Sequence, residues 1–177
     1  DVFTGGKGFA LWLLWNGVRD ETHWDDPENE LVLSCGVIGG ITAYPGTGKT
    51  IAVTISPQTG VVIDSNGGGY FGPYLKFSGW DALEIQGKAD RDVIIFIDGD
   101  EGRVTVEDAP LEAIDTHLIN RQLTEMYGRD DREKRAITVI SAGQAAEHVP
   151  MCGLNISYWD ARRQEVRIKQ AARGGCG

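Results

Sequence analysis

Several features that mark common enzyme classes are missing from this 177-residue sequence. Its three cysteines, Cys35, Cys152 and Cys176, form no CxxC pair, so the chain offers no cysteine ligand set for zinc or an iron–sulfur cluster. The patterns GxSxG, HExxH and GxGxxG are absent as well, which removes the usual signals for a serine hydrolase, a zinc protease and a dinucleotide-binding enzyme. Unpaired cysteines in a chain of this size predict a reducing, cytoplasmic setting.

Positive charge and long apolar runs are also scarce. The chain has 17 Lys and Arg against 26 Asp and Glu, a net charge of -9, so we expect no nucleic-acid partner. Basic residues do gather in residues 160–173. The apolar run FALWLLW (residues 9–15) is too short to span a bilayer and no secretory leader is recognisable, so we expect no membrane association. With 41% hydrophobic residues, the composition is that of one globular domain.

Glycine, by contrast, is abundant and clustered. Of the 24 glycines, 15 gather in five short stretches: GGKG (5–8), GVIGG (36–40), GTG (46–48), SNGGGYFG (65–72) and RGGCG (173–177). Such clusters indicate either close approach of the backbone to a ligand or a protein rich in turns. Clustering alone leaves both interpretations open.

The hydrophobic pattern predicts an α+β protein dominated by strands. We expect helices at 7–18 (buried, because it is apolar nearly all round), 70–80 and 110–128, and strands at 30–38, 49–56, 60–65, 81–89, 93–99, 103–109, 136–141 and 148–159. The helix at 110–128 is expected to have its N-cap at Asp108 and to end at Gly128.

The stretch AYPGTGKT (residues 43–50) is similar to a phosphate-binding P-loop but does not fulfil its requirements. Ala43 replaces the first glycine, and the β-branched residues of TIAVTIS predict a strand where a P-loop needs a helix. A nucleoside triphosphate site is therefore not expected here. Lys49 is then either a surface lysine after a turn or a single cation for another phosphate.

Four segments, taken in order, resemble the N-terminal domain of the tungsten-containing aldehyde:ferredoxin oxidoreductases. They are GGKGFALWLL (5–14), PENELVLSCGVIGGITAYPGTGK (27–49), SPQTGVVIDSNGGGYFGPYLKFSGWDALEIQGKAD (56–90) and ARRQEVRIKQAARGGCG (161–177). The third segment is the most specific. Together they cover almost the whole chain, so chance is a poor explanation for the resemblance.

The resemblance implies a domain of two β-sheets with a few packed helices over residues 1–177, with both ends truncated relative to the family. In that family the domain carries tungstopterin, in which two pterins hold tungsten, or in some relatives molybdenum, through dithiolene sulfurs. A magnesium ion bridges the pterin phosphates. Glycine-rich backbone beside cations suits such planar, phosphate-bearing rings, and carbonyl oxygens suit magnesium.

The resemblance also assigns cofactor-binding residues. Lys49 and Lys169 match the family's two phosphate-binding arginines, and Gly68 and Arg173 match residues that contact the pterins. Asn66 and Gln170 match the residues whose backbone carbonyls bind magnesium. Because both arginines are lysines here, bidentate contacts would become point-charge contacts.

For the whole protein the resemblance implies oxidation of an aldehyde to a carboxylic acid, with electrons passing through a 4Fe–4S cluster to ferredoxin or a related electron-transfer subunit. The cluster ligands and acid/base residues belong to later domains, so no catalytic residue is expected in residues 1–177. A homo-oligomer or a multisubunit complex is expected. The alternatives are a relative with another small-molecule substrate, such as an aryl-CoA reductase, and a β-rich scaffold fragment without metal.

Overall fold

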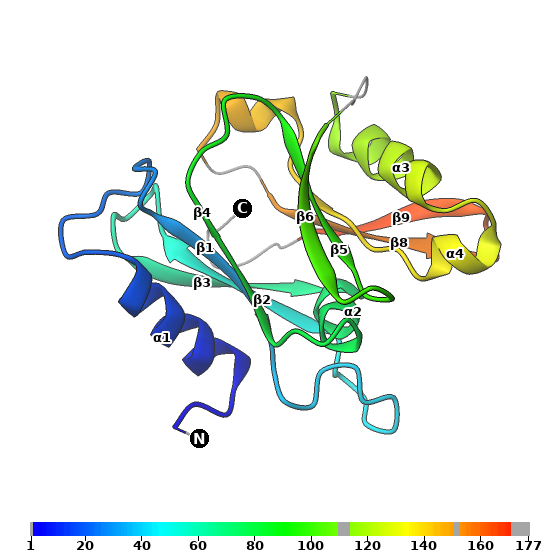
Figure 1. Cartoon of the computed structure of the whole chain (residues 1–177), viewed down its shortest axis with the longest axis horizontal. Coiled ribbons are helices and arrows are strands. Elements are labelled where there is room, and N and C mark those ends of the chain that lie inside the picture. The colour runs from blue at the N-terminus through cyan, green and yellow to red at the C-terminus, as the bar shows by residue number, and fades with distance from the viewer. Residues whose placement is uncertain (1, 110–113, 151–152, 171–177) are drawn as a thin grey trace.

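Three antiparallel sheets and short helices make up the fold (Figure 1). The computed structural model describes residues 2–109, 114–150 and 153–170. The first sheet has the order β3-β2-β1-β4, with β1 (Glu30–Cys35), β2 (Lys49–Ile55), β3 (Val62–Gly68) and β4 (Ala82–Gln86). The second is the hairpin of β5 (Val93–Asp98) and β6 (Arg103–Asp108), and the third contains β7 (Ile140–Ser141), β8 (Asn155–Asp160) and β9 (Glu165–Gln170). The helices are α1 (Gly6–Gly17), α2 (Phe71–Phe77), α3 (Thr116–Tyr127), α4 (Asp131–Arg135) and the 3-10 helix η1 (Gln144–Glu147).

Helix α1 packs on one face of the first sheet. Val32 of β1 and Val53 of β2 are register partners, and both are fully buried against Ala10 and Leu14 of the helix. This small aliphatic core fixes which face of β1 and β2 turns toward α1, because side chains alternate along a strand.

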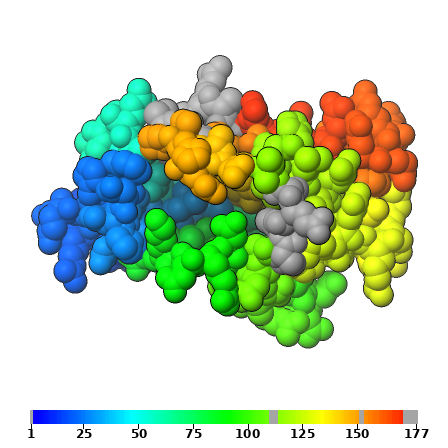
Figure 2. Space-filling model, turned by 90° about the horizontal axis from the view of Figure 1, so that it is seen from above, coloured from blue at the N-terminus to red at the C-terminus, as the bar shows by residue number. Residues whose placement is uncertain are grey.

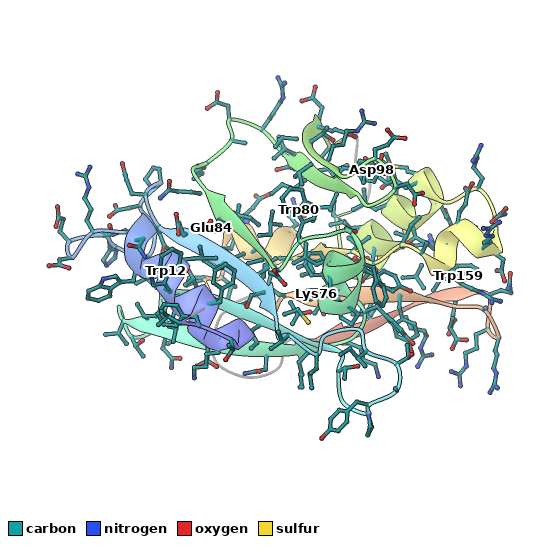
Figure 3. The ribbon with its side chains drawn as sticks, turned by 60° about the horizontal axis from the view of Figure 1, so that its bottom comes forward. Trp12, Lys76, Trp80, Glu84, Asp98 and Trp159 are labelled. Atoms are coloured by element: carbon teal, nitrogen blue, oxygen red, sulfur yellow. The ribbon has the colours of Figure 1, made fainter. Side chains whose placement is uncertain are left out.

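The outer face of α1 is exposed, which corrects the expectation of a buried helix. Trp12 is 44% exposed and Trp15 is 77% exposed, and Figure 3 labels Trp12 on this helix. The sequence is apolar on all sides, but the sheet offers only one surface and can cover only one stripe of the helix.

The opposite face of the first sheet borders a large apolar groove. The groove has a volume of about 1370 Å³, and its walls include Leu33, Ile85, Phe96 and Leu123. In the view of Figure 2 the molecule is hollowed between the green region of β4 and β5 and the orange residues around η1. The β5–β6 hairpin therefore stands apart from the first sheet instead of extending it.

Helix α3 packs on the third sheet through a partly polar interface. The hydroxyl groups of Thr116 and Ser141 are 2.9 Å apart, and Asn120 and Thr124 of the helix are buried. The N-cap of α3 is Asp115, whose carboxylate accepts the backbone N–H of Leu118. Asp108, the expected cap, ends β6 instead, and residues 110–113 of the expected helix lie outside the described residues.

The α+β class is confirmed, although the described strands form three sheets where two were expected. The expected strand 136–141 is mostly wrong, because α4 is followed by irregular chain and only Ile140–Ser141 pairs with β8. Within 148–159 the strand begins at Asn155, and residues 151–152 lie outside the described part. Helix α4 and strand β9 were not predicted. Among the described residues, no helix combines the length and apolar character that crossing a membrane requires.

A buried carboxylate at the end of α1 gives a pH-dependent prediction. Glu30 is 6% exposed, its Oε2 has no hydrogen-bond partner, and its carboxyl group lies directly under Gly17. Burial and the nearby Glu84 carboxylate raise the pKa of Glu30 above its ordinary 4.5. The folded state therefore binds more protons than the unfolded state above about pH 4.5, and stability falls as pH rises toward the raised pKa.

We expect Glu30→Gln to raise the free energy of unfolding by about 1 kcal/mol at pH 7. The gain should shrink toward zero below pH 4.5, where Glu30 is protonated in both states. Urea unfolding at a series of pH values measures the difference. Glu84→Gln, which removes only the neighbouring charge, should give a smaller gain of the same sign. A gain for Glu30→Gln that did not vary with pH would contradict this account.

Candidate functional site

Lys49 is the first residue of β2 and its side chain is exposed. The strand after it forms as the β-branched sequence predicts, so the stretch 43–50 does not open a helix. In the pairing of β2 with β3, the register partner of Lys49 is Gly68, the last residue of β3. The carbonyl oxygen of Lys49 accepts a hydrogen bond from the Cys35 thiol, with 3.3 Å between the sulfur and the oxygen. This bond helps to fix the backbone at Lys49.

Lys169 comes to the same place from a different sheet. A methyl group added at Gly69, directly after β3, would lie 3.2 Å from Cγ2 of Ile156 and 3.9 Å from Cγ of Lys169. Gly69 has φ +134°, a conformation that glycine adopts readily. The end of β3 thus lies against β9, where Lys49 is the register partner of Gly68 and Lys169 lies beside Gly69.

Close backbone contacts explain why this junction needs glycine. A methyl group at Gly48 would come within 2.8 Å of the Gly69 carbonyl oxygen, so the two loops meet backbone to backbone. A methyl group at Gly68 would contact none of the described residues, so among these residues the backbone there is open to a flat ligand. Within the described residues, neither Lys49 nor Lys169 has a carboxylate at ion-pair distance. Within the described part of the chain, the junction therefore presents two positive charges without an ion-pair partner beside glycine backbone.

The two expected magnesium-binding residues flank this junction. Asn66 lies two residues before Gly68 on the same face of β3, opposite Ile51. Gln170 follows Lys169 as the last residue of β9, opposite Asn155. Both are exposed. Arg173 lies outside the described residues, so the structure brings together five of the six expected cofactor-binding residues.

An ion pair that the sequence analysis did not single out borders the site. Lys7 of α1 lies 2.6 Å from Asp64 of β3, and the amide of Asn66 donates to the same carboxylate at 3.4 Å. Lys7 thereby neutralises the negative charge of Asp64, the carboxylate that Asn66 contacts. The GGKG cluster was a signal for this residue, because it places a cation at the start of a helix that covers the sheet.

Protein side chains do not assemble a metal site in the described part of the chain. No three His, Cys, Asp or Glu side chains gather closely enough there to hold an ion. Cys35 is buried, and burial raises the pKa of its thiol, so it is a poor nucleophile. The arrangement is suited to binding an anion with flat rings through cations, carbonyl groups and glycine backbone.

The sequence profile of the family described as "Aldehyde ferredoxin oxidoreductase, N-terminal domain" matches residues 1–177. The chain belongs to this family. A tungsten-containing aldehyde ferredoxin oxidoreductase of Thermococcus kodakarensis is 34% identical over 147 residues, which are 82% of this chain and 23% of that protein. A protein of the same description from Pyrococcus horikoshii is 33% identical over 144 residues.

Two further oxidoreductases are similar to this chain. An aliphatic sulfonate oxidoreductase, WOR-like subunit, of Pyrococcus furiosus is 36% identical over 110 residues, 60% of this chain and 17% of that protein. The solved active site complex BamBC of benzoyl coenzyme A reductase with 1,5-dienoyl-CoA superposes with a TM-score of 0.74 at 28% identity, over 97% of this chain and 24% of that chain. The chain spans about a quarter of the length of the aldehyde ferredoxin oxidoreductases it matches.

Proposed function

We propose that this chain binds the tungstopterin cofactor of an oxidoreductase. The observation that carries the proposal is the meeting of Lys49 and Lys169 at Gly68 and Gly69, in a chain that belongs to this family. Lys49 and Lys169 would bind the pterin phosphates. Gly68, together with Arg173, would contact the pterin rings.

The residues present fit such a group in charge and in shape. Phosphates need cationic donors, and the two exposed lysines have no competing carboxylate among the described residues. A wide ring system needs backbone without side chains, which the open surface above Gly68 offers. The absence of a clustered side-chain ligand set in the described residues is compatible with a metal held by the cofactor's own sulfurs.

Within this proposal the chain positions the cofactor and does no proton chemistry. The backbone carbonyls of Asn66 and Gln170 would hold a magnesium ion, since magnesium prefers oxygen ligands. When bound, the tungsten group supplies the oxidation–reduction chemistry. We assign no catalytic residue within residues 1–177.

For the whole protein we propose oxidation of aldehydes to carboxylic acids, supported by the relatives of that description. Electrons would leave through a 4Fe–4S cluster, with ligands outside residues 1–177, to ferredoxin or an electron-transfer subunit. We propose a cytoplasmic location and an oligomer or multisubunit assembly. An aryl-CoA reductase is the second candidate, favoured by the similarity to the benzoyl coenzyme A reductase complex.

Metal and pterin analysis tests the cofactor proposal. Full-length protein produced in cells supplied with tungstate should retain tungsten, measured by plasma mass spectrometry, and a pterin whose oxidised form fluoresces. Molybdenum in place of tungsten would support the same site with another metal. Protein without metal and without pterin would support the scaffold alternative and contradict the proposal.

Substrate assays separate the two candidate activities. Dye reduction with a panel of aldehydes is expected for the first candidate. Oxidation of a reduced dye with benzoyl-CoA is expected for the second. Loaded protein that is active only with the thioester would reject aldehyde oxidation while leaving the cofactor proposal intact.

A further inference from the structure

A second feature with binding character lies where the start of α2 meets the tip of the β8–β9 hairpin and the end of α4. It is an open cleft with a volume of about 530 Å³, and its lining includes Tyr70, Tyr74, Tyr158, Arg135 and Arg162. We call it the tyrosine–arginine cleft. It shares no residue with the proposed tungstopterin site. Figure 3 shows Trp159, the residue after Tyr158, at the end of the molecule opposite Trp12.

The aromatic side chains of the cleft are held in fixed positions. The ring of Tyr70 has its centroid 5.6 Å from that of Tyr74 and 5.2 Å from that of Tyr158. The hydroxyl of Tyr74 donates to the carbonyl oxygen of Arg135 at 2.6 Å, which ties α2 to α4. Tyr70 is nevertheless 45% exposed, so part of a positioned ring faces solvent. Such a ring is a ready surface for stacking.

The cations of the cleft are available to an anion. Among the described residues, Arg162 has no carboxylate at ion-pair distance, although its neighbour Arg163 pairs with Asp160 at 3.3 Å. Arg135 pairs with Asp131 at 3.2 Å but keeps an exposed side chain. The carboxylate of Asp160 also accepts the backbone N–H groups of both hairpin arginines, at 3.0 Å and 3.3 Å. The acidic group in the lining is therefore already compensated.

We propose that the tyrosine–arginine cleft binds an adenine nucleotide group, with the base stacked on Tyr70 and the phosphates on Arg162 and Arg135. A base without phosphate would leave the arginines unused, and an inorganic anion would leave the ring of Tyr70 unused. The volume lies within the usual range for small-molecule sites, about 300–1,000 Å³. The same chemistry occurs in a free nucleotide and in the adenosine phosphate part of coenzyme A.

Calorimetric titration of the full-length, cofactor-loaded protein tests this site. ADP or coenzyme A should bind, and adenosine and inorganic pyrophosphate should each bind at least about tenfold more weakly, because each makes only half of the contacts. Tighter binding of ADP would identify a free nucleotide as the ligand. Tighter binding of coenzyme A would identify coenzyme A or an acyl thioester of it as the ligand.

Three substitutions locate the ligand. Tyr70→Leu and Arg162→Gln should each weaken binding by about tenfold. Arg121→Gln removes an exposed charge from α3, outside the cleft lining, and should leave affinity unchanged. Pyrophosphate binding as tightly as ADP, no binding of either nucleotide, or unchanged affinity in both Tyr70→Leu and Arg162→Gln would overturn the proposal. Loss of binding in Lys169→Ala alone would place the ligand at the other site and would also overturn it.

Discussion

Full-length protein carrying Lys49→Ala should lose most of its tungsten during purification. A hydrogen bond from a charged donor contributes about 1.5–3 kcal/mol, so removing one phosphate contact should weaken cofactor retention by about tenfold or more. Lys169→Ala should have a similar effect, because its side chain approaches the same glycine pair from β9. Tungsten and pterin content per protein chain measure both.

Two variants make this result specific. Lys49→Arg introduces the residue that the resemblance described above implies at this position, and it should retain tungsten, since it keeps the charge and adds donors. Lys88→Ala removes an exposed lysine from the turn after β4 and should leave tungsten unchanged. Undiminished tungsten in both Lys49→Ala and Lys169→Ala would refute the assigned phosphate contacts, even if the wild-type protein carries the metal.

Gly72→Ala should destabilise the fold and the site together. A methyl group at Gly72 would lie 2.9 Å from the Cys35 Sγ atom and 2.9 Å from the carbonyl oxygen of Lys49. The backbone N–H of Gly72 also donates to the Thr50 hydroxyl at 2.9 Å, so α2 cannot move away from β2 without breaking this bond. Overpacking of this kind costs about 1–3 kcal/mol.

Denaturant unfolding and tungsten content should both respond to Gly72→Ala. The methyl group pushes on the backbone that presents Lys49, so cofactor retention should fall along with the free energy of unfolding. Gly36→Ala is the matched control, because a methyl group there would contact none of the described residues and its φ is not positive. Equal stability of Gly72→Ala and Gly36→Ala would show that the close packing of α2 on β2 does not constrain the fold.

The sequence by itself determined the local structure around Lys49. Alternating β-branched residues can bury one face only as a strand, so Lys49 had to begin a strand and the P-loop interpretation failed. The clustered glycines likewise predicted close backbone approach, and Gly48 and Gly72 have no room for a side chain. The expected strands from 81 to 109 were found for the same reason, with short turns between them.

Some helices and strands were missed or misplaced although the local sequence carried a signal for them. In β9, Val166 and Ile168 alternate with charged residues, which is a strand pattern, yet no strand was predicted in this segment. Asp115 caps α3 and Asp130 caps α4, and aspartate is a favoured N-cap residue. Asp108 is an equally good N-cap residue by type, so only the course of the chain after β6 decided that Asp115, and not Asp108, caps α3. Helix α1 was apolar all round, and the sequence could not say which stripe the sheet would cover.

Tertiary structure alone decided how the site is assembled. Whether β9 extends the first sheet or forms another depends on the packing of α3 and of Trp159, whose indole donates to Asp131 of α4. That packing places Lys169 beside Gly69, far along the chain from Lys49. Periodicity fixes which side of a strand is buried, but long-range contacts fix which strand ends meet, because they depend on side chains distant in sequence. The sequence therefore identified the two lysines and the glycines near them as candidates, and the fold brought these residues to one junction.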